Sequence, residues 1–339
     1  MMALRPRLLS SAATWLDHAG MLNAVSHMAG WAARSDAFQV LTYHRVNDAG
    51  DPFFPAIPTG VFEAQMRHIS LTHAVLPVED LVEQAARGRI PRNALAITFD
   101  DGYRDNLTNA APVLARYALR ATIFLATAYI GSRQRPWYEE IALAFKTTTA
   151  THITAPWGRE WRLAQLADRL SALDECWAHL RTVPESDFDD TVARVLEALG
   201  AARGPVDGAS GNGMLDWADV KGLHGLGFTI GAHTMTHPML SRVTSGRART
   251  EIVGSRDAIA DMTGRVPRAF AYPNGIAADY TPEVVDLVRR AGFTCAVTTR
   301  FGVNTAKTSP WELRRGGPWE YHVPTFALKL AGYRLLRSE

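Results

Sequence analysis

Short apolar runs of the kind that form buried strands alternate with amphipathic segments along most of this chain. The runs are rich in small, β-branched and aromatic residues, and the segments between them carry apolar residues at helical spacing. About seven such runs, alternating with helices, predict an α/β fold with a parallel sheet or a (β/α) barrel. The predicted strands are residues 38–46, 74–78, 94–99, 121–126, 228–232, 269–272 and 293–298.

Polar residues collect where several of these predicted strands end. Residues 94–99 run directly into Asp100, Asp101 and Gly102, and the first predicted strand carries His44 near its end. Functional groups of (β/α) barrels lie at the carboxyl ends of the strands. The alternative, an open doubly wound sheet, is not supported, because the sequence has no glycine-rich nucleotide loop after the early strands. Two adjacent carboxylates in a poorly solvated cleft repel each other, which indicates a bound cation or a protonated Asp.

The segments outside this alternation divide the chain. Residues 38–339 are expected to form one domain that contains a helical insertion at 130–213 and a C-terminal segment at 311–339. Residues 1–37 are predicted to form an amphipathic helical segment that packs on the flank of the domain, with contact to a membrane surface as the alternative. Polar residues interrupt its apolar run too early for a secretory signal, so we expect a cytoplasmic protein, with the inner membrane surface as the alternative location.

Charge and cysteine content exclude several classes of protein. The chain has 36 basic and 34 acidic side chains, a formal net charge of +2, which provides no global field to attract nucleic acid. Cys176 and Cys295 lie far apart in the sequence and outside any metal-binding cluster, so we expect two free thiols and no disulfide framework. The oligomeric state is left open by the sequence.

His233 and His237 stand four residues apart at the end of a predicted strand. If these residues form a helical turn, both imidazoles can converge on one cation, although a pair at this spacing is often a surface coincidence. Asp101 turns the pair into a three-ligand set of two histidines and one carboxylate, which leaves a coordination position for water. The combination favours a catalytic metal site.

The ordered motifs Thr98–Gly102, His233–His237 and Phe270–Gly275 resemble those of the polysaccharide deacetylase family, also called the NodB homology or carbohydrate esterase 4 group. The resemblance covers roughly residues 38–299 and is weakest in the insertion. It implies a distorted (β/α)7 barrel in which Asp101, His233 and His237 bind a divalent metal, most often Zn²⁺, with Co²⁺, Ni²⁺ or Mn²⁺ as alternatives. It implies that Asp100 is the general base, the other reading being a second metal ligand or a helix N-cap.

The acid that protonates the leaving amine is not where this family usually has it. No late Leu-x-His motif follows Cys295, but residues 41–44 (Leu-Thr-Tyr-His) have a similar strand-ending form. In a closed barrel the first and last strands are neighbours, so we expect His44 to be the general acid, with His322 as the rival and a buried structural role as the alternative.

The third motif departs from the family pattern as well. Ala271 stands where the family has the arginine that orients the base, and Asn274 stands where it has tyrosine. We therefore predict that Arg314 or Arg315 pairs with Asp100 from the C-terminal segment. Tyr272 and Pro273 are expected to line the substrate groove beside Asn274, where a backbone N–H can help to stabilise the oxyanion.

The function that these residues predict is metal-dependent removal of the N-acetyl group from an amino sugar in a polysaccharide or a lipid-linked glycan precursor. One alternative is a metal-dependent hydrolase of another non-peptide amide. The other is a catalytically silent glycan-binding or assembly protein, which would have no need for the combined Asp and His set. The expected partner is an N-acetylated glycan, with no nucleic acid and with peripheral membrane contact by the termini as an open alternative.

Overall fold

The computed structural model describes residues 10–11, 13–16, 21, 24, 36–204, 213–316 and 320–333. Strands and helices alternate along most of it, as the hydrophobic pattern predicts. The strands of the barrel are β1 (Ala37–Tyr43), β2 (Ala74–Val75), β3 (Ala94–Phe99), β4 (Thr122–Leu125), β7 (Thr229–Ala232), β8 (Ala269–Ala271), β9 (Cys295–Val297) and β10 (Asn304–Thr305). The helices around it are α3 (Thr59–Thr72), α4 (Val78–Ala86), α5 (Ala111–Arg116), α9 (Trp217–Gly225), α10 (Ser245–Thr263), α11 (Pro282–Arg290) and α12 (Val323–Tyr333).

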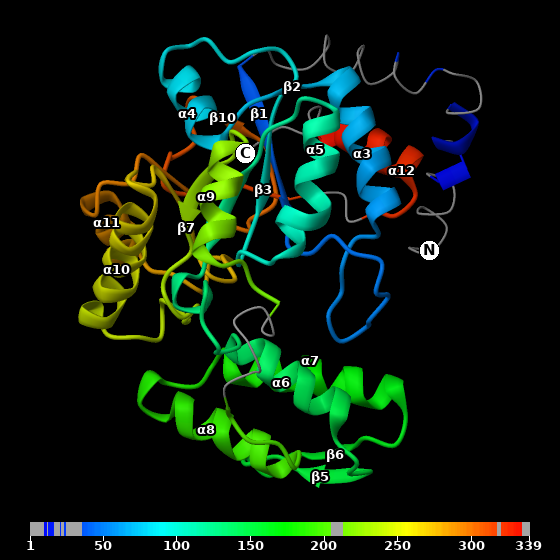
Figure 1. Cartoon of the computed structure of the whole chain (residues 1–339), viewed down its shortest axis with the longest axis vertical. Helices are drawn as coiled ribbons and strands as arrows, with labels where there is room; N and C mark the ends of the chain where they lie inside the picture. The colour runs from blue at the N-terminus through cyan, green and yellow to red at the C-terminus, as the bar shows by residue number, and fades with distance from the viewer. Residues whose placement is uncertain are drawn as a thin grey trace.

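One curled sheet organises the molecule (Figure 1). Its strands follow the order β10-β1-β3-β4-β7-β8-β9, and the neighbours from β1 to β9 are parallel. β2 is parallel to β3 and pairs with its first residues, whereas β4 pairs with its last residues. The strands predicted from the sequence are all present, which confirms the α/β, barrel-like fold class. β10, a two-residue edge strand antiparallel to β1, was not predicted.

The first and last parallel strands are not direct neighbours, contrary to the expectation of a closed barrel. Residues 310–316, a turn followed by extended chain from Leu313, lie between them. Leu313 bonds with Ala296 and Thr298 of the β9 edge, and the Gly316 N–H donates to the Val40 carbonyl of β1. The segment therefore takes the place of a strand and brings the C-terminal part of the chain to the barrel interior.

Apolar side chains of the strands and of the surrounding helices form the main core. In Figure 1, α3, α5 and α12 lie on one side of the sheet and α10 and α11 on the opposite side. Phe326 and Leu330 of α12 join this core, so the described part of the C-terminal helix packs on the barrel. Most of residues 1–37 lie outside the described residues; within the described ones, 13–16 are helical. Within the part that the structure describes, no helix is both long and apolar enough to cross a membrane.

The insertion has more structure than the sequence suggested. It contains α6 (Trp137–Thr147), the antiparallel strands β5 (His152–Thr154) and β6 (Glu160–Arg162), α7 (Leu166–Leu180) and α8 (Glu185–Ala198). The sequence predicted a helical insertion and missed the β5–β6 hairpin. These elements share a hydrophobic cluster of their own below the barrel (Figure 1). Cys176 lies in this cluster and Cys295 in the barrel, and both thiols are free and buried.

Candidate active site

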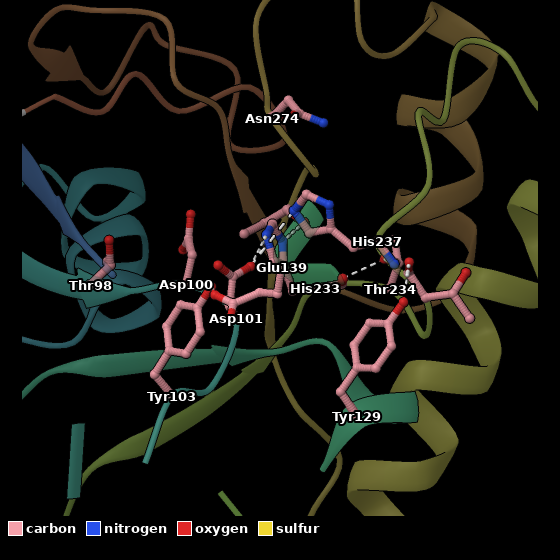
Figure 2. A network of polar contacts seen from close by, with 12 residues as sticks. Thr98, Asp100, Asp101, Tyr103, Tyr129, Glu139, His233, Thr234, His237 and Asn274 are labelled. Carbon is pink, nitrogen blue, oxygen red and sulfur yellow. Dashed lines mark hydrogen bonds and ion pairs between the residues drawn. The ribbon is translucent and has the colours of Figure 1, made fainter. Parts of the chain in front are cut away.

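Two adjacent carboxylates leave the end of β3 in different directions. Asp101 has φ +73°, in the left-handed region, and Gly102 follows with φ +86°. This positive φ, together with a Cβ position that would lie 2.8 Å from Leu125 Cδ2, favours glycine in the close turn beneath the site. Figure 2 shows the Asp101 carboxylate turned toward the imidazoles of His233 and His237, whereas Asp100 points away from them. The sharp turn therefore separates two like charges that are adjacent in sequence.

Asp100 is neutralised by an arginine of the C-terminal segment. Arg315 Nη1 and Nη2 each lie 2.7 Å from one carboxylate oxygen of Asp100 in a bidentate ion pair, and both side chains are buried. Burial alone would raise the pKa of Asp100, but the guanidinium of Arg315 and the nearby His233 hold this pKa well below its usual range. Asp100 is therefore an ionised carboxylate at neutral pH without the help of a metal ion.

Asp101, His233 and His237 form a buried group whose ligand atoms all lie within 4.8 Å of one another. Asp101 Oδ1 lies 3.6 Å from His233 Nε2 and 3.7 Å from His237 Nε2, and it has no hydrogen-bond partner among the described residues. His233 Nδ1 lies 2.7 Å from the Ala271 carbonyl, which can only accept a proton, so Nε2 keeps its lone pair. This donor set fits a divalent cation.

The loop that carries the two histidines is not helical, contrary to the prediction of a helical turn. Thr234 and His237 both have positive φ angles, +65° and +57°. Glu251 of α10, which is 1% exposed, accepts the backbone N–H groups of Met235 and Thr236 at 2.7 and 2.8 Å. The Thr234 hydroxyl accepts the His237 N–H at 3.1 Å, so this hydrogen bond joins the two ends of the loop. A buried glutamate therefore fixes the geometry that helical spacing was expected to provide.

Burial and the neighbouring His233 lower the pKa of His237 from 6.5 to about 4. In the metal-free protein the unfolded chain therefore binds a proton at His237 that the folded chain does not. We expect this to reduce the free energy of unfolding by roughly 3 kcal/mol as the pH falls from 6.5 to 4. The depressed pKa of Asp100 affects stability over a lower pH range, because its contribution to the free energy of unfolding is lost only below the ordinary Asp pKa of 3.8.

Urea unfolding of metal-free wild type and His237→Gln at pH 7 and pH 4 measures this effect, because the variant removes only the contribution of His237. Wild type should lose roughly 3 kcal/mol more than the variant over this interval. An equal loss in the two proteins would contradict the assignment of a neutral, buried His237.

A cavity of about 470 Å³ opens above these residues, between the barrel and the insertion. His44 lies at its wall, one residue beyond the Tyr43–Phe99 pair of the sheet register, and thus opposite Asp100. The cavity is mainly apolar and includes several aromatic side chains. Its lining includes Thr42, His44, Arg45, Phe53, Phe54, Asp100, Asp101, Tyr103, Trp137, Tyr138, Glu139, Trp177, Arg181, His233, His237, Asn274 and Tyr321.

Three of the predicted site residues lie elsewhere. Tyr272 and Pro273 do not line the cavity: the Tyr272 ring is fully buried, stacks on Tyr280 and donates its hydroxyl proton to the Trp311 carbonyl at 2.9 Å. The prediction that both line the groove was therefore wrong, because the strand end turns this tyrosine into the core. Arg314 also lies outside the cavity lining, with its side chain over Gly302.

Asn274 does line the cavity, and its amide nitrogen lies 3.0 Å from Met239 Sδ. The rival acid His322 does not line it. Its imidazole is exposed and bonds to Thr325 at 2.7 Å, on the flank where α12 meets the helical residues Ser10 and Thr14. His44 is therefore the one of the two proposed acids that the fold brings to Asp100.

Sequence reasoning missed the contribution of the insertion to this site. Arg45 Nη2 lies 2.5 Å from Glu139 Oε1 of α6, and the Tyr103 hydroxyl donates to the same oxygen at 2.8 Å. Trp137 and Trp177, which were not assigned to substrate, lie at the cavity wall. The insertion is thus the second wall of the candidate active site.

Comparison with known proteins agrees with the family resemblance of the sequence motifs. Residues 87–296 match the family model described as polysaccharide deacetylase. The chain is 24% identical over 180 residues to the Bacillus subtilis protein YxkH, itself assigned to the polysaccharide deacetylases. This match spans 49% of the present chain and 62% of YxkH.

Solved structures show the same fold at low sequence identity. The deacetylase PplD of Streptococcus pyogenes, in complex with acetate, superimposes with a TM-score of 0.54 at 17% identity, covering 83% of this chain and 92% of PplD. IcaB from Ammonifex degensii gives a TM-score of 0.54 at 21% identity, covering 88% of this chain and 98% of IcaB. These similarities concern the arrangement of the barrel.

Proposed function

We propose that this chain, which belongs to the polysaccharide deacetylase family of hydrolases, removes the N-acetyl group of an amino sugar in a glycan or lipid-linked glycan precursor. A divalent metal would assist this reaction. The family model that matches residues 87–296 confirms the resemblance seen in the motifs. The metal, with Zn²⁺ as the first candidate, and the glycan are parts of the proposal.

One observation carries this proposal. Within a single cavity, Asp100 is paired with Arg315, whereas Asp101 faces two histidines and has an oxygen without a partner. The first carboxylate is therefore available to move a proton, and the second is available to hold a cation with His233 and His237. Metal-assisted hydrolysis of an amide uses both of these groups beside the scissile bond.

The residues of this chain then have separate tasks. A divalent cation held by Asp101, His233 and His237 would lower the pKa of the attacking water and polarise the acetyl carbonyl. Asp100, which is ionised at neutral pH, accepts a proton from this water. His44, on the neighbouring strand end, donates a proton to the nitrogen as the carbon–nitrogen bond breaks.

Substitution of His44 tests the acid role. In His44→Gln we expect kcat on an N-acetyl sugar to fall by about 10²-fold, because the amine leaves poorly without a proton. On 4-nitrophenyl acetate, whose leaving group needs no proton, we expect a loss of less than about 5-fold. The two substrates are compared at equal metal content. Equal losses on both would show that His44 acts on some step other than protonation of the leaving group.

The proposed function is tested by measuring acetate release from N-acetylglucosamine oligomers, with small acetamides and other linear amides as comparison substrates and with metal analysis of the same protein. We expect a bound metal and acetate release from the oligomers at a higher kcat/KM than from the small amides. Bound metal with turnover of another amide alone would favour the second hydrolase function. Absence of both metal binding and turnover would favour a silent glycan-binding protein.

A further inference from the structure

The first turn of α6 lies directly against the second histidine of the candidate metal group. Trp137 Nε1 donates to the His237 carbonyl at 3.1 Å. The ring of Tyr138 lies next to the His237 imidazole, with 4.9 Å between ring centroids and 60° between the planes. Both aromatic residues line the cavity that contains Asp100 and Asp101. The insertion therefore lines the cavity and also contacts a candidate metal ligand directly.

Tyr138 differs from the other tyrosines around this centre. The Tyr103 hydroxyl donates to Glu139 Oε1 at 2.8 Å, and the Tyr129 hydroxyl donates to the Thr236 carbonyl at 3.1 Å. The Tyr138 hydroxyl oxygen is buried and has no hydrogen-bond partner among the described residues. Asp101 Oδ1, a candidate metal ligand, and Thr42 Oγ1 are further buried oxygens of the cavity residues that have no partner among the described residues.

A buried hydroxyl without a partner costs the folded protein about 1–3 kcal/mol. Replacement of this tyrosine by phenylalanine would remove that cost without changing the ring packing against His237. A phenol is a neutral donor at physiological pH, since its ordinary pKa is about 10. The group is therefore suited to an acceptor oxygen that reaches the Asp101 side of the cavity from outside the chain.

Three other polar side chains of the site already have partners. Arg315 is paired with Asp100, and Arg45 is paired with Glu139. The side-chain amide of Asn274, at the position where the resemblance expected a tyrosine, lies against Met239 Sδ. Among the cavity residues close to His237, Tyr138 thus has a hydroxyl hydrogen that no other described side chain or carbonyl accepts.

We propose that the Tyr138 hydroxyl, contributed by the insertion, donates a hydrogen bond to the acetyl oxygen of the substrate as negative charge develops on it. This inference rests on the proposed deacetylase function. The proton stays on the phenol throughout, so Tyr138 supplies a dipole and takes no part in proton transfer. A donor that is fixed in place before the reaction stabilises the transition state more than the ground state.

Tyr138→Phe tests this role because it keeps the ring against His237 and Trp137. We expect kcat on N-acetylglucosamine oligomers to fall by about 10- to 100-fold, with KM within about 3-fold of wild type and unchanged metal content. We also expect the Kd for the product acetate, measured by titration of the metal-loaded protein, to rise by about 10-fold. Tyr117→Phe is the matched control, because it removes a hydroxyl that bonds to Glu63 outside the cavity lining.

The outcomes separate this inference from the proposed function. Wild-type kcat and acetate affinity in Tyr138→Phe would overturn the role of the hydroxyl while leaving the deacetylase function intact. A loss of kcat that matches a loss of bound metal would also overturn it, because Tyr138 would then act through the packing of His237. Failure of wild type to release acetate from any N-acetylated glycan would instead refute the proposed function.

Discussion

Asp100→Asn is expected to lower kcat by about 10³-fold while the protein still binds its metal. The amide cannot accept a proton from the attacking water, and general base catalysis contributes about 10²- to 10⁴-fold. Metal content should be unchanged, because Asp100 faces Arg315 and lies outside the group formed by Asp101, His233 and His237. The measurements are kcat on N-acetylglucosamine oligomers and metal analysis of the purified variant.

Asp101→Asn is the matched control for this experiment, since it changes the adjacent residue in the same way. We expect it to lose most of its bound metal together with its activity, because a neutral amide is a poorer ligand than a carboxylate. Near-ultraviolet circular dichroism checks that both variants stay folded. Full activity in Asp100→Asn, or loss of metal from it, would contradict the separation of the two carboxylates.

Arg315→Ala is expected to lower kcat by about 10²-fold and to destabilise the fold by roughly 3–5 kcal/mol. The variant leaves the buried carboxylate of Asp100 without its counter-charge, which is the costly way to break a buried ion pair. The pKa of Asp100 should rise, since burial then acts without the opposing guanidinium. Arg315→Lys should recover part of the stability but little of kcat, because an ammonium cannot reproduce the two parallel hydrogen bonds.

Arg314→Ala is the control, because Arg314 is adjacent in sequence but lies outside the cavity lining. We expect its kcat to stay within about 2-fold of wild type and its free energy of unfolding to change by less than about 1 kcal/mol. Thermal unfolding and the pH dependence of kcat/KM measure the two effects. If Arg315→Ala has the kcat and pH profile of wild type, the ion pair does not orient or ionise Asp100.

The positions of the strands along the chain and the candidate metal ligands followed from local sequence signals. Buried parallel strands are short apolar runs, and their polar ends meet at one edge of the sheet. This was sufficient to bring Asp101 together with His233, although they are far apart in the chain. The capping box of Asp216 and Asp219 at the start of α9 is another local signal.

The choice between Arg314 and Arg315 depends on tertiary structure. Leu313 and Arg315 are two residues apart in an extended segment and are both buried, whereas Arg314 lies on the other side. Alternation therefore decides which arginine faces Asp100. The sequence does not reveal that this segment lies between β9 and β1, because its hydrogen-bond partners are set by the closure of the sheet.

The sequence also contains a pattern that predicts helix α6. Trp137, Ile141, Ala144 and Phe145 are buried and have the spacing of one helix face. The role of Glu251 had no such signal, since it lies on an exposed-looking helix among several charged residues. Its function depends on the positive φ angles of Thr234 and His237, and spacing alone does not predict them.

The most direct test of metal-dependent deacetylation is a metal titration of the metal-free protein, in which acetate release from N-acetylglucosamine oligomers is followed at each step. We predict that the rate rises in proportion to bound Zn²⁺ and reaches its maximum at one ion per chain, and that His233→Ala shows neither tight binding nor turnover. Full turnover in the rigorously metal-free protein, or one tightly bound ion without acetate release from any N-acetylated glycan, would contradict it.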